Sequence, residues 1–137
     1  MHNCSRYLRM AFDPKHRSNT ITKAIKTLES VKFDAVVCKG VSGLAIAPTI
    51  ADAFGVSLCV VRHKKAKDHS HCEKLVEGPE NITRFIIIDD FVCTGATVCQ
   101  IFQAMRQEYP EALYRKKDSF SISKMRNRVY QTKKHYL

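Results

Sequence analysis

The sequence predicts an α/β fold with an open, mostly parallel central sheet flanked by helices. Three short apolar runs, at 35–38, 57–62 and 85–88, indicate buried strands. Segments with helical spacing of apolar residues stand before the first run, between the first two, and after the last. Strands that alternate with helices in this way favour parallel neighbours joined by right-handed crossovers.

The first helix is expected over residues 20–30, where apolar residues recur at helical spacing. Asp13-Pro14 indicates a turn before it, and Ser18 or Asn19 can cap its amino end. The helix would pack through one side, which holds Ile21, Ala24, Ile25, Leu28 and Val31.

Two further helices are expected to follow the first and third strands. The helix after the first strand is expected over residues 44–54. Pro48 is expected to bend this helix or delay its start, and Gly55 to end it. The other begins after a turn at 94–97 and ends before Pro110. Its apolar face is expected to hold Val98, Ile101, Phe102 and Met105.

The composition indicates one cytoplasmic domain. With 137 residues the chain is long enough to bury a core without disulfides. No apolar run approaches the roughly 20 residues of a membrane span and no signal-peptide pattern opens the chain, so a membrane is not expected as a partner. The six cysteines form no CxxC pair, and buried reduced thiols are expected at Cys38, Cys59, Cys93 and Cys99.

The third predicted strand ends in two adjacent carboxylates, Asp89 and Asp90, at the edge where open α/β sheets bind ligands. Backbone N–H groups at the helix start that follows can bind a phosphate, while paired acids suit a sugar diol or a hydrated divalent cation. The stretch therefore predicts a ribose phosphate site; the alternative is an ordinary strand–turn–helix whose acids only cap the helix. The turn between acids and helix contains Cys93, Thr94, Gly95, Ala96 and Thr97.

Residues 85–97 resemble the phosphoribosyl-pyrophosphate (PRPP) motif of the type I phosphoribosyltransferases: a hydrophobic strand, two acids and a Thr-Gly-x-Thr turn. The resemblance, which covers about residues 34–105, implies a PRPP- and Mg²⁺-dependent transferase of nucleotide salvage. Such an enzyme attaches ribose 5-phosphate to a nitrogenous base and releases pyrophosphate. The resemblance also implies that Asp89 and Asp90 hold the ribose hydroxyls and assist Mg²⁺ through water, while residues 93–97 bind the 5-phosphate.

Two features depart from that family. Residues 1–17 and 111–137 are the only material for the hood that holds the base in family members, so a reduced hood is expected on a single domain spanning residues 1–137. Cys93 stands where members that use 6-oxopurines usually carry an aspartate near the ring nitrogen of the base. This difference favours adenine, a pyrimidine or an unusual acceptor over hypoxanthine or guanine.

A glycine-containing loop is expected after the first strand. Its two glycines permit main-chain N–H groups to approach a diphosphate closely, although a plain strand-to-helix turn is the alternative. The loop is similar to the family's pyrophosphate loop, in which a strained, often cis, peptide would lie near Lys39-Gly40 or Gly40-Val41. The pyrophosphate-binding residues of this loop are expected to be Lys39, Gly40, Val41, Ser42 and Gly43.

A basic run follows the second predicted strand, with Arg62 and Lys64 nearest the strand end and Lys65 next to them. These cations can neutralise a pyrophosphate leaving group through the transition state, or they form only a solvated face. In the family similar residues lead into a flexible loop, and residues 63–80 are expected to be that lid over PRPP. The loops after all three strands are expected to meet at one edge of the sheet.

The formal net charge is +10, and much of it lies near the C-terminus. From Arg115 onward eight Lys or Arg stand against one acid, Asp118, with aromatic residues interleaved. This segment can bind RNA by phosphate contacts and base stacking, form a solvated tail, or serve as a contact arm of a homodimer. The alternative function is therefore a non-catalytic PRPP- or nucleotide-sensing, or RNA-binding, regulator on the same fold, and an inactive relative that binds no PRPP also stays open.

Overall fold

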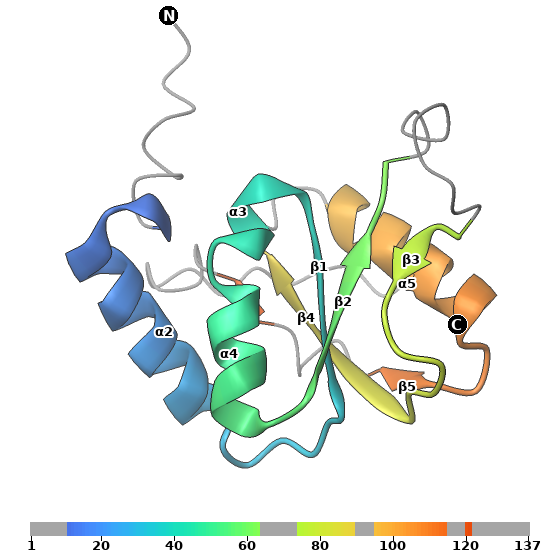
Figure 1. Cartoon of the computed structure of the whole chain (residues 1–137), viewed down its shortest axis with the longest axis horizontal. Coiled ribbons are helices and arrows are strands. Elements are labelled where there is room, and N and C mark those ends of the chain that lie inside the picture. Colours follow the sequence, from blue (N-terminus) through green and yellow to red (C-terminus); the bar gives the residue numbers. More distant parts are fainter. Residues whose placement is uncertain (1–10, 64–73, 90–94, 115–119, 122–137) are drawn as a thin grey trace, which may run out of the picture.

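The computed structural model of the protein describes residues 11–63, 74–89, 95–114 and 120–121. Its sheet has the strand order β3-β2-β1-β4-β5, and a sixth strand, β6, pairs with β4. The three central strands are β1 (Ala35–Lys39), β2 (Ser57–Val61) and β4 (Arg84–Asp89). β1 lies between the other two and is parallel to both, which confirms the predicted α/β architecture (Figure 1).

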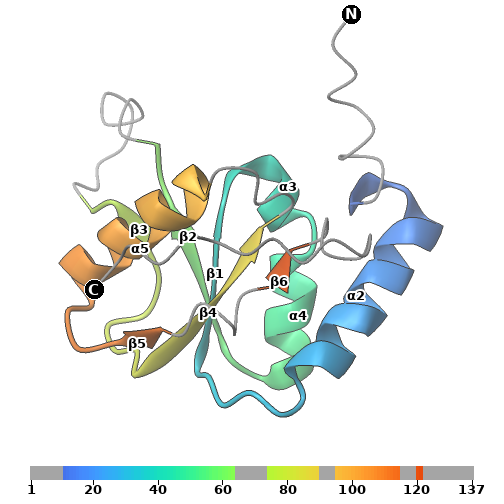
Figure 2. The same ribbon diagram turned by 180° about the vertical axis from the view of Figure 1, so that it is seen from behind.

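Three two-residue strands complete the edges of the sheet. β3 (Val76–Glu77) runs antiparallel to β2, whereas β5 (Leu113–Tyr114) is parallel to the beginning of β4. β6 (Phe120–Ser121) is parallel to the end of β4, and Figure 2 shows both strands beside it. The sequence did not predict these strands because two residues carry no readable alternation.

Helices cover both faces of the sheet. α2 (Pro14–Leu28) and α4 (Ala47–Phe54) lie on one face, and α5 (Ala96–Glu108) lies on the other (Figure 1). Alternation along the strands divides the core between the two faces. On the α2 and α4 face the buried core residues of β1 and β4 are Val36, Cys38, Ile86 and Ile88, and on the α5 face they are Ala35, Val37, Phe85 and Ile87.

The first helix begins earlier than the sequence predicted. Asp13 is the N-cap of α2, and its side chain accepts a hydrogen bond from the backbone N–H of His16 at 3.0 Å. Proline suits the position after the cap because it has no N–H to leave unpaired. The chain bends at Asp13, in agreement with the turn predicted there, whereas the predicted caps, Ser18 and Asn19, are wrong because they lie inside the helix. The buried residues of the helix are Thr20, Ala24 and Leu28.

The loop predicted after β1 is instead a short helix, α3 (Gly40–Leu44), which leads directly toward α4. The prediction that Pro48 delays the following helix is confirmed, since a proline occupies its first turn. Gly55 closes α4 as predicted, with a positive φ of 62°. On α5, Ile101 and Met105 are buried as predicted, whereas Phe102 is 36% exposed.

Two of the cysteines predicted to be buried thiols, Cys38 and Cys59, are free and buried, and Cys99 is half-buried. Cys93 lies outside the described residues. Within the described ranges, no helix has both the length and the apolar character needed to cross a membrane.

Candidate functional site

The carboxyl ends of the three central strands lie together at one edge of the sheet. Lys39, the last residue of β1, pairs with Val61, the last residue of β2. On the other side Val37 pairs with Ile87, so that two residues further along these parallel strands Lys39 and Asp89 stand at the same level. The segments that leave the three strands therefore start side by side, as the sequence predicted.

Asp89 is buried at this edge, with only 3% of its surface exposed. Burial, together with the charge of the neighbouring Asp89, raises the pKa of Cys38 to about 12, which places the carboxylate close to the end of β1. A carboxylate withdrawn from bulk water is suited to hydroxyl donors or a cation that can replace its hydration. Asp90, its predicted companion, lies outside the described residues.

After β4 the described structure resumes at Gly95, the N-cap of α5. Gly95 has a φ of 78°, a left-handed conformation that side chains disfavour, and no side-chain cap bonds to the helix start. Ala96 and Thr97 form the first turn of the helix, whose amino end carries positive dipole character suited to an anion. Cys93 and Thr94, predicted to bind the same phosphate, lie outside the described residues.

The two glycines after β1 have different surroundings. Gly40 has a φ of 82° and open space where a Cβ atom would stand. Gly43 is buried, and a Cβ atom there would lie 2.9 Å from the Cβ of Cys38. Among the described residues every peptide bond is trans, so the expected cis bond at Gly40 is absent and its positive φ is the unusual feature of this turn. Val41 is 69% exposed, and nothing is described of the side chain of Ser42.

The end of β2 is tied to β3. The side-chain Nε of Arg62 lies 2.8 Å from a carboxylate oxygen of Glu77. The backbone N–H of Arg62 donates a hydrogen bond to the backbone carbonyl of Leu75 at 2.8 Å. Residues 76–77 therefore belong to the sheet, so the expected lid at 63–80 is wrong at its carboxyl end. Lys64 and Lys65 lie outside the described residues.

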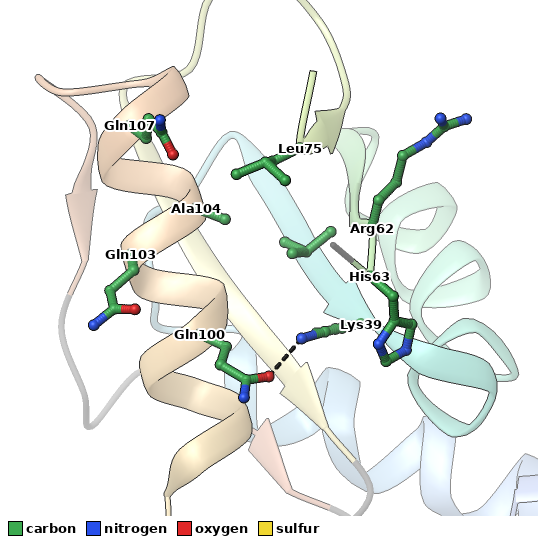
Figure 3. Close-up of a pocket in the computed structure, with 9 residues that line it drawn as sticks. Lys39, Arg62, His63, Leu75, Gln100, Gln103, Ala104 and Gln107 are labelled. Carbon is green, nitrogen blue, oxygen red and sulfur yellow. Dashed lines mark hydrogen bonds between the residues drawn. The ribbon is translucent and has the colours of Figure 1, made fainter. Parts of the chain in front are cut away.

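A cavity of about 730 Å³ opens beside the edge, on the face covered by α5. Figure 3 shows Lys39 and Gln100 pointing toward one another across it, and the Lys39 Nζ donates a hydrogen bond to the Gln100 Oε1. The Arg62 side chain points away from them in the same view. The described residues that line the cavity include no acid and are Lys39, Val61, Arg62, His63, Leu75, Gln100, Gln103, Ala104 and Gln107.

The glutamines of α5 were not singled out from the sequence. Gln100, Gln103 and Gln107 recur at helical spacing on the polar side of a helix whose other side is apolar, and this periodicity is the signal that could have located them. Within the described part of the chain, no three His, Cys, Asp or Glu side chains are grouped closely enough to hold a metal ion.

Comparison with known proteins identifies similar sequences. A family model described as the phosphoribosyl transferase domain matches residues 17–117. The chain is also 25% identical over 96 residues to a hypoxanthine/guanine phosphoribosyltransferase of Methanobacterium lacus (strain AL-21), a match that covers 62% of this chain and 50% of the relative. The chain therefore spans about half the length of this curated relative.

Several solved structures share the architecture. UMP synthase from Leishmania donovani aligns with a TM-score of 0.66 at 22% identity, over 85% of this chain and 28% of that chain. Adenine phosphoribosyltransferase from Thermoanaerobacter pseudethanolicus aligns with a TM-score of 0.55 at 19% identity, over 82% and 83% of the two chains. The adenine phosphoribosyltransferase of Saccharomyces cerevisiae, solved with an imino-altritol bisphosphate and adenine, gives 0.53 at 26% identity over 73% and 62%. The chain thus has the fold of these proteins.

Proposed function

Because the chain belongs to the phosphoribosyl transferase domain family, which matches it over residues 17–117, we propose that it transfers ribose 5-phosphate from PRPP to a nitrogenous base and releases pyrophosphate. Membership of the family confirms the resemblance to type I phosphoribosyltransferases that residues 85–97 indicated. Enzymes of this type are glycosyltransferases. The activity itself is a proposal, since the chain spans half the length of the curated relative.

One observation carries the proposal: β4 ends in a buried carboxylate at the edge where β1 also ends, and the amino end of α5 comes next in the described structure. Asp89 closes the strand, and α5 begins at Ala96 after the left-handed Gly95. Asp89 would accept hydrogen bonds from the ribose hydroxyls, with Asp90 beside it. The 5-phosphate would lie at the amino end of α5, bound by residues 93–97. The sugar and its phosphate therefore have adjacent binding groups.

The pyrophosphate end of PRPP is assigned to the segments after β1 and β2. The Lys39 ammonium supplies positive charge at the strand edge, and the left-handed Gly40 permits a ligand to approach the backbone closely. Residues 41–43 continue this segment, and Arg62, Lys64 and Lys65 are the other proposed cations. As the ribosyl–pyrophosphate bond breaks, negative charge grows on the leaving group, and cations already in position stabilise it without reorganising.

Magnesium fits the donor chemistry of the site. Carboxylate oxygen is the ligand type that Mg²⁺ prefers, and the ion usually keeps several waters and binds substrate phosphates. Asp89 and Asp90 would hold it through water. When bound, the ion would neutralise charge on the pyrophosphate group.

The acceptor is proposed to be a nucleobase. Matched proteins are named for hypoxanthine/guanine and adenine, and one was solved with adenine. Cys93, in place of the aspartate usual for 6-oxopurines, favours adenine, a pyrimidine or an unusual acceptor. The free thiols of Cys38 and Cys59 suit a reducing compartment, and we propose the cytoplasm.

The test measures pyrophosphate release from PRPP and Mg²⁺ with adenine, hypoxanthine, guanine, xanthine, orotate and uracil in turn. Release with at least one base is expected, and Asp89→Asn should lower kcat/KM for that base by about 100-fold. Asp52→Asn is the matched control, because Asp52 is exposed on α4. No release with any base, together with no heat of PRPP binding in calorimetry, would overturn the proposal.

The second candidate function is a nucleic-acid-binding regulator, and the net charge of +10 favours it. A regulator of this kind would bind RNA with an affinity that falls steeply as salt rises. Reversing two charges in the C-terminal segment, in the variant Lys133→Glu/Lys134→Glu, would then weaken RNA binding and reduce the salt slope. Pyrophosphate release by the wild type, without RNA binding at 150 mM salt, decides for the enzyme.

A further inference from the structure

Lys39 and Gln100 are joined across the site by a hydrogen bond from the lysine Nζ to the glutamine Oε1, although they are 61 positions apart. Lys39 ends β1, and Gln100 lies in the second turn of α5 (Figure 3). The proposed function assigns the β1 end to the pyrophosphate of PRPP and the α5 start to its 5-phosphate. The bond therefore connects the two phosphate-binding segments.

The packing of the sheet places both partners. Ala35 and Val37 of β1 lie in the core cluster on the α5 face, and alternation directs Lys39 to that same face. Ile101, next to Gln100 in the helix, is fully buried in the same cluster. Gln100 thus projects from a turn of α5 that is anchored to the sheet, so its side chain has a fixed base from which to reach the lysine.

The acceptor on α5 is a neutral amide. An amide oxygen orients an ammonium group without neutralising it, whereas a carboxylate would pair with the lysine and compete with an anionic ligand. An ammonium has three N–H donors, so a single bond to Gln100 leaves two for phosphate oxygens. Among the described residues that line the cavity none is acidic, and the lining residue Arg62 is paired with Glu77, which is not one of them.

We propose that Gln100 is a positioning residue that holds the Lys39 ammonium at the strand edge, ready for the pyrophosphate group of PRPP. The inference rests on the proposed function and adds to it a residue outside the PRPP motif. A lysine side chain has many rotamers, and ordering it on binding weakens affinity. A pre-existing bond to Gln100 removes part of that loss before PRPP arrives.

The first test compares Gln100→Ala with Asp52→Asn, by calorimetry with PRPP and Mg²⁺ and by steady-state kinetics. Asp52 is exposed on α4 and does not line the cavity. Gln100→Ala should raise the Kd and the KM for PRPP about fivefold and change kcat less than about twofold, because positioning acts on binding. Asp52→Asn should change neither constant more than about twofold. Gln100→Glu should bind PRPP more weakly than Gln100→Ala, because its carboxylate would neutralise Lys39.

A double-mutant cycle with Lys39→Ala separates positioning from a general structural effect. If Gln100 acts through the lysine, Gln100→Ala has no further effect on PRPP affinity once Lys39 is alanine. An equal loss of affinity in both backgrounds would overturn the inference. Wild-type affinity in Gln100→Ala would also overturn it while leaving the proposed function intact. Absence of PRPP binding by the wild type would overturn both.

Discussion

Gly43 of α3 and Cys38 of β1 are in direct contact: a Cβ atom on Gly43 would lie 2.9 Å from the Cβ of Cys38. The same atom would lie 3.2 Å from the carbonyl oxygen of Ile88 in β4. α3 therefore rests on two neighbouring strands just before they end at Lys39 and Asp89. The absence of a side chain at Gly43 sets how close the helix can approach the edge that forms the proposed site.

Replacing Gly43 by alanine should push α3 away from the strands. Overpacking of a filled core typically costs about 1–3 kcal/mol, and a loss of this size in the free energy of unfolding is expected in urea denaturation. PRPP binding should weaken as well, because the turn at Gly40 moves with the helix. Leu44→Ala is the control on the same helix, since the Leu44 side chain is 40% exposed. Equal stability of Gly43→Ala and the wild type would contradict the contact.

The features of the site that depend on neighbouring residues in the sequence were predictable, whereas those that depend on contacts between distant residues were not. The three central strands and the strand-end position of Asp89 follow from apolar runs and their spacing, and the structure confirms them. The sequence does not distinguish the roles of Gly40 and Gly43. Only the tertiary structure shows that Gly40 is an open left-handed turn and that Gly43 packs closely against neighbouring strands. The role of Gln100 depends on a residue 61 positions away, which no local pattern reveals.

The sequence analysis also misplaced the start of α2 and did not predict α3. Asp13-Pro14 is compatible with both a turn and a capped helix start, and the polar stretch that follows weakened the helical period. The loop predicted at 39–43 is a short helix because α3 packs on β1 and β4, a contact that outweighs the low helix propensity of glycine. Local capping by Asp13 decided the first case, and tertiary packing decided the second.

Asp34 connects the segment before β1 to the start of β4. Its carboxylate accepts hydrogen bonds from the Thr83 N–H at 2.9 Å, the Thr83 hydroxyl at 2.6 Å and the Arg84 N–H at 2.9 Å. Burial alone would raise the pKa of Asp34, but these bonds outweigh it and lower the pKa below its ordinary value of 3.8. Because the folded pKa is the lower one, the stabilisation is present above the unfolded pKa and is lost as pH falls through the folded pKa.

Asp34→Asn should therefore lower the free energy of unfolding at pH 7 by about 1–3 kcal/mol, because an amide cannot accept all three bonds. The difference from the wild type should shrink as the pH is lowered from about 5 to about 2, where the wild-type carboxyl also loses its charge. Urea denaturation at a series of pH values measures both effects. Asp52→Asn, at an exposed position of α4, is the control. A gap between Asp34→Asn and the wild type that does not change with pH would contradict this role of the charge.

The pair between Arg62 and Glu77 should compete with the binding of pyrophosphate. The Arg62 Nε lies 2.8 Å from the Glu77 carboxylate, and both side chains are partly exposed, so the pair is worth at most about 1 kcal/mol. If Arg62 contacts pyrophosphate as proposed, Glu77→Gln should release it and tighten PRPP binding up to about fivefold in calorimetry. Glu80→Gln, at a nearby exposed position, should have no effect. Weaker binding in Glu77→Gln would show that the pair positions Arg62 instead.

Cys38 and Cys59 should resist alkylation in the folded protein. Burial raises the pKa of each thiol to about 12, with the charge of Asp89 adding to the effect at Cys38. Iodoacetamide at pH 8 should therefore leave both unmodified in mass spectra of the native chain and modify both in urea, because the thiolate is the reactive form.

The same shifts imply alkaline sensitivity of the fold. Above about pH 9 the unfolded thiols ionise while the folded ones stay protonated, so each should lower stability by about 1.4 kcal/mol per further pH unit up to about pH 12. Cys59→Ala should flatten this slope relative to the wild type. The alkylation experiment also tests the burial of the site. If Cys38 in the native chain is alkylated at pH 8 as fast as in urea, the end of β1 is open to solvent, and the burial described for the strand ends beside Asp89 is contradicted.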